Sequence, residues 1–262
     1  GMLTAIGMAI DASKGIQQEE VTYSDTSCDI VVVGAGGAGL SAAVQAASMG
    51  ADVIVLEKQG IIGGNTNYST GGLNAAETSV HQKLGIQDSK QSHFDDTMSG
   101  GHFLNDSSLV ATLVNKAAEA VDWLISLGAD MSNVGQMAGS SQKRTHRPDG
   151  GAAIGPHLMS VLNKAVQAEN ISIRTRNTVT SLTEQSGKVT GVKVSTSKGT
   201  YSIQAKAVIL ATGGFGANLS MIGQYRPELK DFHTSNHHGA TGDAFGWVAP
   251  LQASLVLMDQ IQ

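Results

Sequence analysis

The stretch from Asp29 to Glu57, DIVVVGAGGAGLSAAVQAASMGADVIVLE, constrains the fold of this chain more than any other segment. It begins with a β-branched run, residues 30–33, which is typical of a strand buried on both faces. Gly34, Gly36 and Gly39 follow with the spacing G-x-G-x-x-G. The first glycine permits a tight turn, the second lets the backbone approach a pyrophosphate, and the third lets a helix pack closely on the strand.

The rest of this stretch completes a strand–helix–strand unit. Residues 37–49 are rich in alanine and other small residues, which predicts a helix pressed against a sheet, and Gly50 is placed to end it. Asp52 to Leu56 predicts a second buried strand, which Glu57 closes. An acidic side chain there can accept hydrogen bonds from both ribose hydroxyls of an adenosine. The unit therefore predicts an ADP-containing cofactor held at the helix N-terminus, with a merely structural glycine turn as the alternative.

Length and composition exclude several classes of protein. The 262 residues suffice for one large domain or two small ones. Seventeen basic and 22 acidic residues give a net charge of −5 without any basic block, which argues against nucleic acid as the main partner. The single cysteine, Cys28, excludes an internal disulfide and a cysteine-ligated cluster. No apolar run is long enough for a membrane span, and the sequence leaves localisation open between periplasm and cytoplasm.

A second glycine-rich segment follows Glu57 and departs from the pattern of an NAD-dependent dehydrogenase. Residues 58–76 read KQGIIGGNTNYSTGGLNAA. The backbone amides of such a segment can cradle phosphates or face a flat ring, and a flexible surface loop is the alternative. Near the end of the chain, His237 and His238 lack the spacing and the carboxylate partner of a metal pair, so we expect no metal site.

Two further helices are predicted after this segment. The first runs from about Ser107 to Leu127, capped by Asn105 or Asp106 and ended by Gly128. Its expected apolar face consists of Leu109, Leu113, Val114, Ala117, Val121 and Leu124. The second helix is expected from Pro156 to about Glu169.

The remaining pattern predicts strands, at residues 171–174, 178–184, 188–196, 200–204 and 207–210. Three of them alternate apolar and polar residues around turns at Ser186-Gly187 and Lys198-Gly199, which predicts an antiparallel meander. The last strand ends in ATGG, residues 211–214, a second glycine turn at a strand end. The motif GATGDA then contains Asp243, for which a simple turn former is the alternative reading.

The order of these motifs resembles the flavoprotein family of fumarate reductases and succinate dehydrogenases, particularly the soluble fumarate reductases of the flavocytochrome c type. The resemblance covers residues 29–262. It is carried by VIVLEKQGIIGGNTNYSTGGLNAA, KRTHRPDGGAAIGPH, AVILATGGF and GATGDAFG. It implies an α/β fold: a Rossmann-like FAD-binding domain of the glutathione-reductase type, with a parallel sheet plus an antiparallel β-meander.

The resemblance also implies a domain organisation. Residues 29–262 are expected to be the first segment of an FAD-binding domain, with the capping domain and remaining segments absent. Residues 1–20 are expected to form an N-terminal helix and linker, which weakly resembles the end of the small FMN-binding domain that precedes FAD in some relatives.

A set of cofactor-binding residues follows from the resemblance. Gly37 and Ala38 are expected to lie against the pyrophosphate, Glu57 to hold the adenosine ribose, Val179 to contact the adenosine end and Asp243 to reach the ribityl region. The segment around Asn65, Thr66, Thr70, Gly71 and Gly72 is expected to line the flavin. The full set is Gly34, Gly36, Gly37, Ala38, Gly39, Glu57, Lys58, Gly64, Asn65, Thr66, Thr70, Gly71, Gly72, Val179, Ala211, Thr212, Gly213 and Asp243.

Two features refine this expectation. Membrane-bound relatives attach FAD covalently through a histidine at the position of Asn65, and asparagine cannot form that bond, so we expect non-covalent FAD.

The basic segment that contains Lys143, Arg144, His146 and Arg147 is either a solvated loop or a cationic patch near phosphates, the flavin edge or a dicarboxylate. The catalytic residues are not expected in this chain but after Gln262.

The implied function is that of an FAD-dependent oxidoreductase that reduces an activated C=C bond. The leading hypothesis is reduction of fumarate to succinate by hydride transfer from N5 of reduced flavin. The alternatives are an FAD-binding module or fragment without its own catalysis, and a related reductase such as urocanate reductase. The expected partner is a small dicarboxylate substrate, with no nucleic acid and no membrane span. The electron donor is open, and an FMN or haem domain of the parent protein is a candidate.

Overall fold

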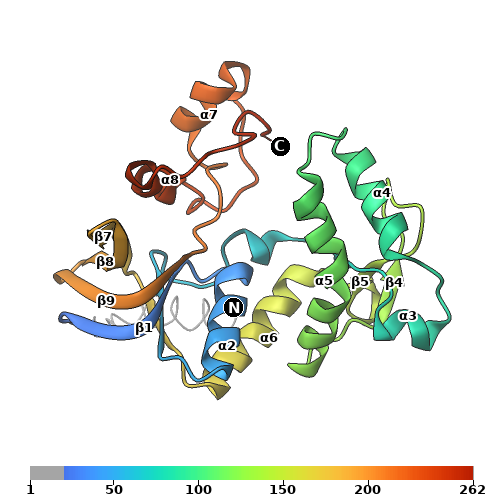
Figure 1. The fold of residues 1–262 in the computed structure, drawn as a ribbon, viewed down its shortest axis with the longest axis horizontal. Coiled ribbons are helices and arrows are strands. Elements are labelled where there is room, and N and C mark those ends of the chain that lie inside the picture. Colours follow the sequence, from blue (N-terminus) through green and yellow to red (C-terminus); the bar gives the residue numbers. More distant parts are fainter. Residues whose placement is uncertain (1–20, 262) are drawn as a thin grey trace, which may run out of the picture. The chain divides into compact units, whose positions relative to one another are not determined.

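The structure is a computed structural model that describes residues 21–261 (Figure 1). The expected N-terminal helix and linker, residues 1–20, lie outside the described residues. The chain divides into two compact units. The first comprises Gly1–Thr66 and Leu162–Gln262, and the second comprises Asn67–Val161.

The first unit contains a six-stranded mixed sheet in the order β6-β2-β1-β9-β8-β7. Figure 1 labels four neighbouring strands of it, β1, β9, β8 and β7. The strands β6, β2, β1 and β9 are parallel, whereas β9, β8 and β7 are antiparallel. The bounds are β1 Thr26–Val33, β2 Val53–Glu57, β6 Ser172–Thr175, β7 Thr178–Gln185, β8 Lys188–Thr196 and β9 Gly199–Leu210. The expected parallel sheet and the expected antiparallel meander are both confirmed, as parts of one sheet.

Strand β9 joins these two parts of the sheet. The sequence predicted two strands, 200–204 and 207–210, but Gly199–Leu210 is a single strand of 12 residues. Its first half pairs antiparallel with β8, and it pairs parallel with β1 from Ile203 to Leu210. Ala205 pairs with Cys28 and keeps the strand extended between the two predicted segments, so the expected break does not occur.

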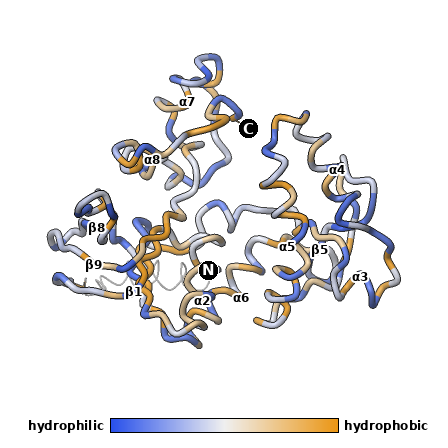
Figure 2. Tube along the Cα trace, viewed as in Figure 1, coloured by the Kyte–Doolittle hydropathy of each residue, from blue (hydrophilic) through white to orange (hydrophobic). Residues whose placement is uncertain are grey.

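Helix α2, Gly37–Ser48, covers β1 and β2 as the glycine fingerprint requires. Leu40, Ala43 and Val44 are buried on its inner side. Gly50 follows the helix with a φ of 89°, which confirms the predicted left-handed end. Figure 2 shows hydrophobic residues beside α2. Val31 and Val32 of β1 are fully buried.

The first unit also contains short elements that the sequence did not predict. They are α7 Leu219–Tyr225, η3 Pro227–Leu229, α8 Asp243–Val248 and η4 Ala249–Leu251. Each is too short to produce a clear hydrophobic period. The short helix η1, Gly64–Tyr68, lies in the second glycine-rich segment.

The second unit combines helices with a three-stranded antiparallel sheet in the order β3-β5-β4. Its elements are β3 Leu73–Asn74, α3 Ser79–Leu84, α4 Lys90–Gly100, α5 Ser107–Ser126, β4 Asn133–Gly135, β5 Thr145–Arg147 and η2 Asp149–Gly151. Helix α6, Ile154–Ala168, begins two residues before the predicted start at Pro156. The carboxylate of Asp106 accepts hydrogen bonds from the amides of Ser108 and Leu109, at 2.8 and 3.2 Å, which confirms it as the cap of α5.

The apolar face predicted for α5 is partly wrong. Its buried residues are Val110, Val114, Ala117, Val121 and Leu124. Leu109 and Leu113 are 68% and 55% exposed. The buried stripe repeats every three or four residues starting from Val110, so these two leucines fall on its outer flank.

Among residues 21–261, no helix has both the length and the hydropathy needed to cross a membrane.

Candidate cofactor site

A cavity of about 510 Å³ opens in the first unit where β1, β2 and β9 end. It is lined by Val33 and Gly34 after β1, by Glu57 at the end of β2, and by Leu210 and Ala211 at the end of β9. In open α/β sheets, ligands bind outside the carboxyl ends of the strands. The volume is within the range of about 300–1,000 Å³ that small-molecule sites occupy.

Most of the predicted cofactor-binding residues line this cavity. They are Gly34, Gly36, Gly37, Ala38, Glu57, Lys58, Gly64, Asn65, Thr66, Val179, Ala211, Thr212, Gly213 and Asp243. Gly39 does not line it, because its α-carbon packs against the turn: a Cβ there would lie 1.8 Å from the carbonyl oxygen of Gly34. Thr70, Gly71 and Gly72 belong to the second unit and are not among the lining residues.

The two glycine turns form one structure. Gly34 has a φ of 104°, and a Cβ there would lie 2.4 Å from the carbonyl oxygen of Ala211. The amide of Ala211 in turn donates to the carbonyl oxygen of Val33 at 2.8 Å. Only glycine allows the first turn to approach the end of β9 this closely. The ATGG motif therefore supports the fingerprint loop as well as lining the cavity.

The N-terminus of α2 is exposed to the cavity. The amide of Gly37 donates to the hydroxyl of Thr66 at 3.0 Å, which ties the second glycine-rich segment to the helix. The next amides, of Ala38 and Gly39, have no acceptor within the helix because they belong to its first turn. Together with the helix dipole they favour a negatively charged ligand. The residues present therefore fit an anionic dinucleotide.

Glu57 is 9% exposed and held in place by the backbone. Its Oε2 accepts from the amide of Ala35 at 3.0 Å, and its Oε1 accepts from the amide of Gln59 at 2.7 Å. Each carboxylate oxygen has a further lone pair with which it can accept a ligand hydroxyl. The geometry thus fixes the acid at the cavity wall before any ligand binds.

Lys58 and Asp243 form an ion pair at the cavity, with 2.6 Å between Nζ and Oδ2. The hydroxyl of Thr241 donates to the other oxygen of Asp243, at 2.6 Å. Burial acts to raise the pKa of Asp243, but the hydrogen bonds from Lys58 and Thr241 outweigh it and hold the pKa below its usual value. The ionised pair connects the end of β2 to the first residue of α8.

Asn65 is bonded within the same unit rather than left free. Its Nδ2 donates to Oδ1 of Asn236, and its Oδ1 accepts from the amide of His237, both at 2.6 Å. His237 lines the cavity, accepts from the amide of Gly239 through Nδ1 at 3.0 Å, and stacks on His238 at 4.3 Å. Burial lowers its pKa. Among the described residues, no group of His, Cys, Asp and Glu is arranged to hold a metal ion.

Sequence reasoning missed several lining residues, including Asn177, Thr178 and His237. Asn177 follows Arg176, which has a φ of 56° and interrupts the extended conformation between β6 and β7. An asparagine between two strands signals a turn, but it does not show which way the turn faces. No local pattern places the segment from Asn236 to Ala240 beside the cavity.

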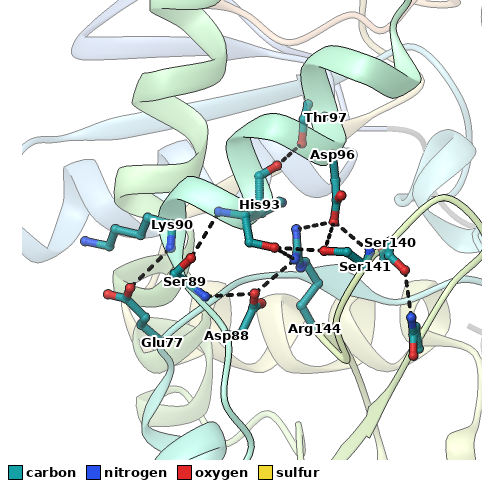
Figure 3. Close-up of polar contacts among 12 residues, drawn as sticks. Glu77, Asp88, Ser89, Lys90, His93, Asp96, Thr97, Ser140, Ser141 and Arg144 are labelled. Carbon is teal, nitrogen blue, oxygen red and sulfur yellow. Dashed lines mark hydrogen bonds and ion pairs between the residues drawn. The ribbon is translucent and has the colours of Figure 1, made fainter.

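Both interpretations of the basic segment are wrong for Arg144 and His146. Arg144 is 1% exposed, and its guanidinium lies 2.9 Å from Asp88 and 3.1 Å from Asp96 (Figure 3). His146 is fully buried, with its Nε2 2.8 Å from the hydroxyl of Thr78. The Arg144 charge is therefore balanced inside the second unit, and it offers no cationic site to a phosphate or a dicarboxylate.

Comparison with known proteins places this geometry among flavoproteins. Residues 29–262 match the family described as "FAD binding domain". The chain is 43% identical to a fumarate reductase (cytochrome) of Shewanella frigidimarina over 89% of its length and 41% of the relative's. It is 36% identical to a urocanate reductase of Eggerthella lenta, over 99% of its length and 45% of the relative's.

A solved structure gives the same result at the level of the fold. The open conformation of a flavocytochrome c3 fumarate reductase superimposes with a TM-score of 0.84 and 37% identity, over 95% of this chain and 43% of that one. The chain thus spans less than half the length of each of these relatives.

Proposed function

This chain belongs to the FAD-binding domain family of the fumarate reductase and succinate dehydrogenase flavoproteins, and we propose that its cavity holds FAD non-covalently in a reductase of fumarate. The observation that carries the proposal is the cavity at the strand ends, which unites both glycine turns, the start of α2 and Glu57. An FAD-binding domain of this family implies FAD rather than a nicotinamide cofactor.

Each part of the cavity suits one part of the cofactor. The unpaired amides at the start of α2 suit the pyrophosphate. The carboxylate of Glu57 suits the adenosine ribose, since its free lone pairs can accept from both hydroxyls. Asp243, held ionised by Lys58 and Thr241, suits the hydroxyls of the ribityl chain. These assignments rest on where the α2 amides, Glu57 and Asp243 line the cavity and on the hydrogen bonds that each can form.

Non-covalent binding is supported by the side chains of the cavity wall. Asn65 carries no nucleophilic ring nitrogen, and both ends of its amide are bonded to Asn236 and His237. Its side chain therefore holds two segments of the wall together.

The proposed substrate is a dicarboxylate alkene. When bound, FAD would supply the hydride that reduces the C=C bond, and the residues of the cavity would hold and orient it. Support for fumarate comes from relatives named as fumarate reductases, at 43% identity in sequence and 37% in the solved structure. Arg144 is not proposed as a substrate ligand, because two carboxylates already balance its charge.

Reduction of urocanate is the second candidate, supported by 36% identity to a urocanate reductase. The two are separated by adding either acid anaerobically to the natural protein that contains this chain, with a chemically reduced dye as donor. Dye oxidation with fumarate but not urocanate is expected. The reverse selectivity would replace the proposed substrate. Bound FAD without oxidation by either acid would favour a binding module without its own catalysis.

A further inference from the structure

A cluster of aromatic and polar side chains, two of them buried and two half-buried, adjoins the cavity but contains none of the residues predicted to bind the cofactor. It consists of Tyr23, Arg174 on β6, Asn177 and Tyr201 on β9. The ring of Tyr201 is 4% exposed and stacks on that of Tyr23, with 5.4 Å between centroids. The guanidinium of Arg174 lies over the Tyr23 ring at 4.5 Å. The cluster thus holds Tyr201 in a single orientation.

The hydroxyl of Tyr201 is the polar centre of this cluster. It donates to Oδ1 of Asn177 at 2.6 Å and accepts from a guanidinium nitrogen of Arg174 at 3.3 Å. A tyrosine hydroxyl is protonated at neutral pH, and burial raises the pKa of Tyr201 further. Tyr201, on the meander, therefore orients the side chain of Asn177, just after β6.

Asn177 transmits this contact to the cavity. It is 3% exposed and lines the cavity together with Thr178 and Val179. Its side-chain Nδ2 donates to the carbonyl oxygen of Thr175 at 2.8 Å. Its backbone N–H donates to the carbonyl oxygen of Glu57 at 3.0 Å. The side chain thus holds the backbone through Nδ2 and is itself held by Tyr201 through Oδ1, and the turn lies directly beside Glu57.

The order of the strands indicates which part of the ligand meets this turn. The N-terminus of α2, next to β1, suits the pyrophosphate, and Glu57 at the end of β2 suits the ribose. The next strand outward is β6, which pairs with β2. On that side the cavity is lined by Asn177, Thr178 and Val179, where a base attached to that ribose would lie.

We propose that Tyr201 is a positioning residue for the adenosine half of the cofactor. Its hydroxyl orients Asn177, and Asn177 fixes the turn that forms the adenosine wall of the cavity. The inference rests on the proposed location of FAD in this cavity. It deepens that proposal by assigning a role to a residue that does not line the cavity.

The test measures binding of ADP, which carries the adenosine half alone, and of FAD to flavin-free protein by calorimetry. Tyr201→Phe removes the hydroxyl and keeps the ring, and we expect it to weaken ADP and FAD binding about three- to tenfold. Asn177→Ala should weaken both at least as much. The double variant should bind ADP no more weakly than Asn177→Ala alone, because Tyr201 acts through Asn177.

The matched control is Tyr225→Phe, whose hydroxyl makes no hydrogen bond recorded among the described residues and whose ring packs on Phe215. It should leave ADP affinity unchanged. Unchanged ADP affinity in Tyr201→Phe, or additive losses in the double variant, would overturn the inference. Should Tyr201→Phe fail to fold, an unchanged ADP affinity in Asn177→Ala would also overturn it.

Measurements on the wild-type protein test the adenosine assignment separately from the proposed binding of FAD. Binding of both FAD and ADP is expected. Binding of FAD without any ADP binding would overturn the adenosine assignment while leaving the flavoprotein proposal intact. Binding of neither would contradict the proposed function itself.

Discussion

Glu57 illustrates how one side chain can serve both the fold and the ligand. Its carboxylate accepts an amide from the fingerprint turn, at Ala35, and another from Gln59. These bonds fix its orientation without rotamer freedom, so little entropy is lost when a ribose binds. A carboxylate held in this way also repels the phosphate of a 2′-phosphorylated nucleotide.

Glu57→Ala is predicted to weaken FAD binding by about 1.5–3 kcal/mol, the scale of hydrogen bonds to a charged group. The measurement is a flavin fluorescence titration of flavin-free protein. Glu169→Ala, at an exposed glutamate just after α6, is the matched control and should leave the affinity unchanged. Equal affinities in the Glu57 variant and the wild type would show that Glu57 does not hold the ribose.

At the scale of elements, the sequence predicted best where a local pattern sets the backbone conformation. The fingerprint turn, α2 with its end at Gly50, and the cap of α5 at Asp106 were all predicted and confirmed. The hairpin turn at Ser186-Gly187 was also predicted, and both residues have positive φ, as a two-residue hairpin requires.

The sequence failed where the structure depends on contacts between distant segments. Nothing local shows that β9 continues through Ala205, because that continuity comes from pairing with β1. The burial of Arg144 depends on Asp88 and Asp96, which lie far from it in sequence. A cluster of basic residues alone suggests exposure, and only the tertiary structure reveals the paired carboxylates.

Arg144 is predicted to be essential to the stability of the second unit. Arg144→Met removes the cation and leaves Asp88, whose side chain is fully buried, without its partner. Breaking a buried ion pair in this way costs about 3–5 kcal/mol. Urea unfolding measures the loss, and Lys143→Met, at an exposed neighbour, is the control. A loss no larger than that of the control would mean that the pair does not stabilise the fold.

Three buried histidines of the same unit make it sensitive to acid. Burial lowers the pKa of His81, His93 and His146, and for the first two it outweighs the opposing effect of the Asp88 carboxylate. Each is therefore neutral in the folded state at a pH at which the unfolded chain already binds a proton. The contribution of the neutral histidines to the free energy of unfolding should be fully present above the ordinary pKa of 6.5. It should be lost as the pH falls from there towards the lowered pKa values of the folded state.

The thermal midpoint should therefore decrease between about pH 7.5 and pH 5.5. His93→Leu should make this decrease smaller, because it removes one of the titrating groups. His102→Asn changes an exposed histidine of the same unit and should leave the slope as it is. A midpoint independent of pH over this range would contradict the account.

At the scale of the whole molecule, the chain has the means to hold a dinucleotide, whereas the charge of Arg144 is not available to hold a substrate. The cavity, the glycine turns and the acid at β2 all lie in the first unit. The Arg144 charge is used within the second unit. Family membership and the geometry of the cavity thus both point to FAD. The identity of the alkene substrate is part of the proposed function.

The most direct test of the central claim is to identify the cofactor that the purified protein carries. The protein is precipitated with acid, and the supernatant is analysed by chromatography against FAD, FMN and NAD standards. The account predicts a yellow protein that releases FAD, close to one per chain, into the supernatant and leaves a colourless pellet. A colourless protein that takes up NADH but no flavin would contradict it.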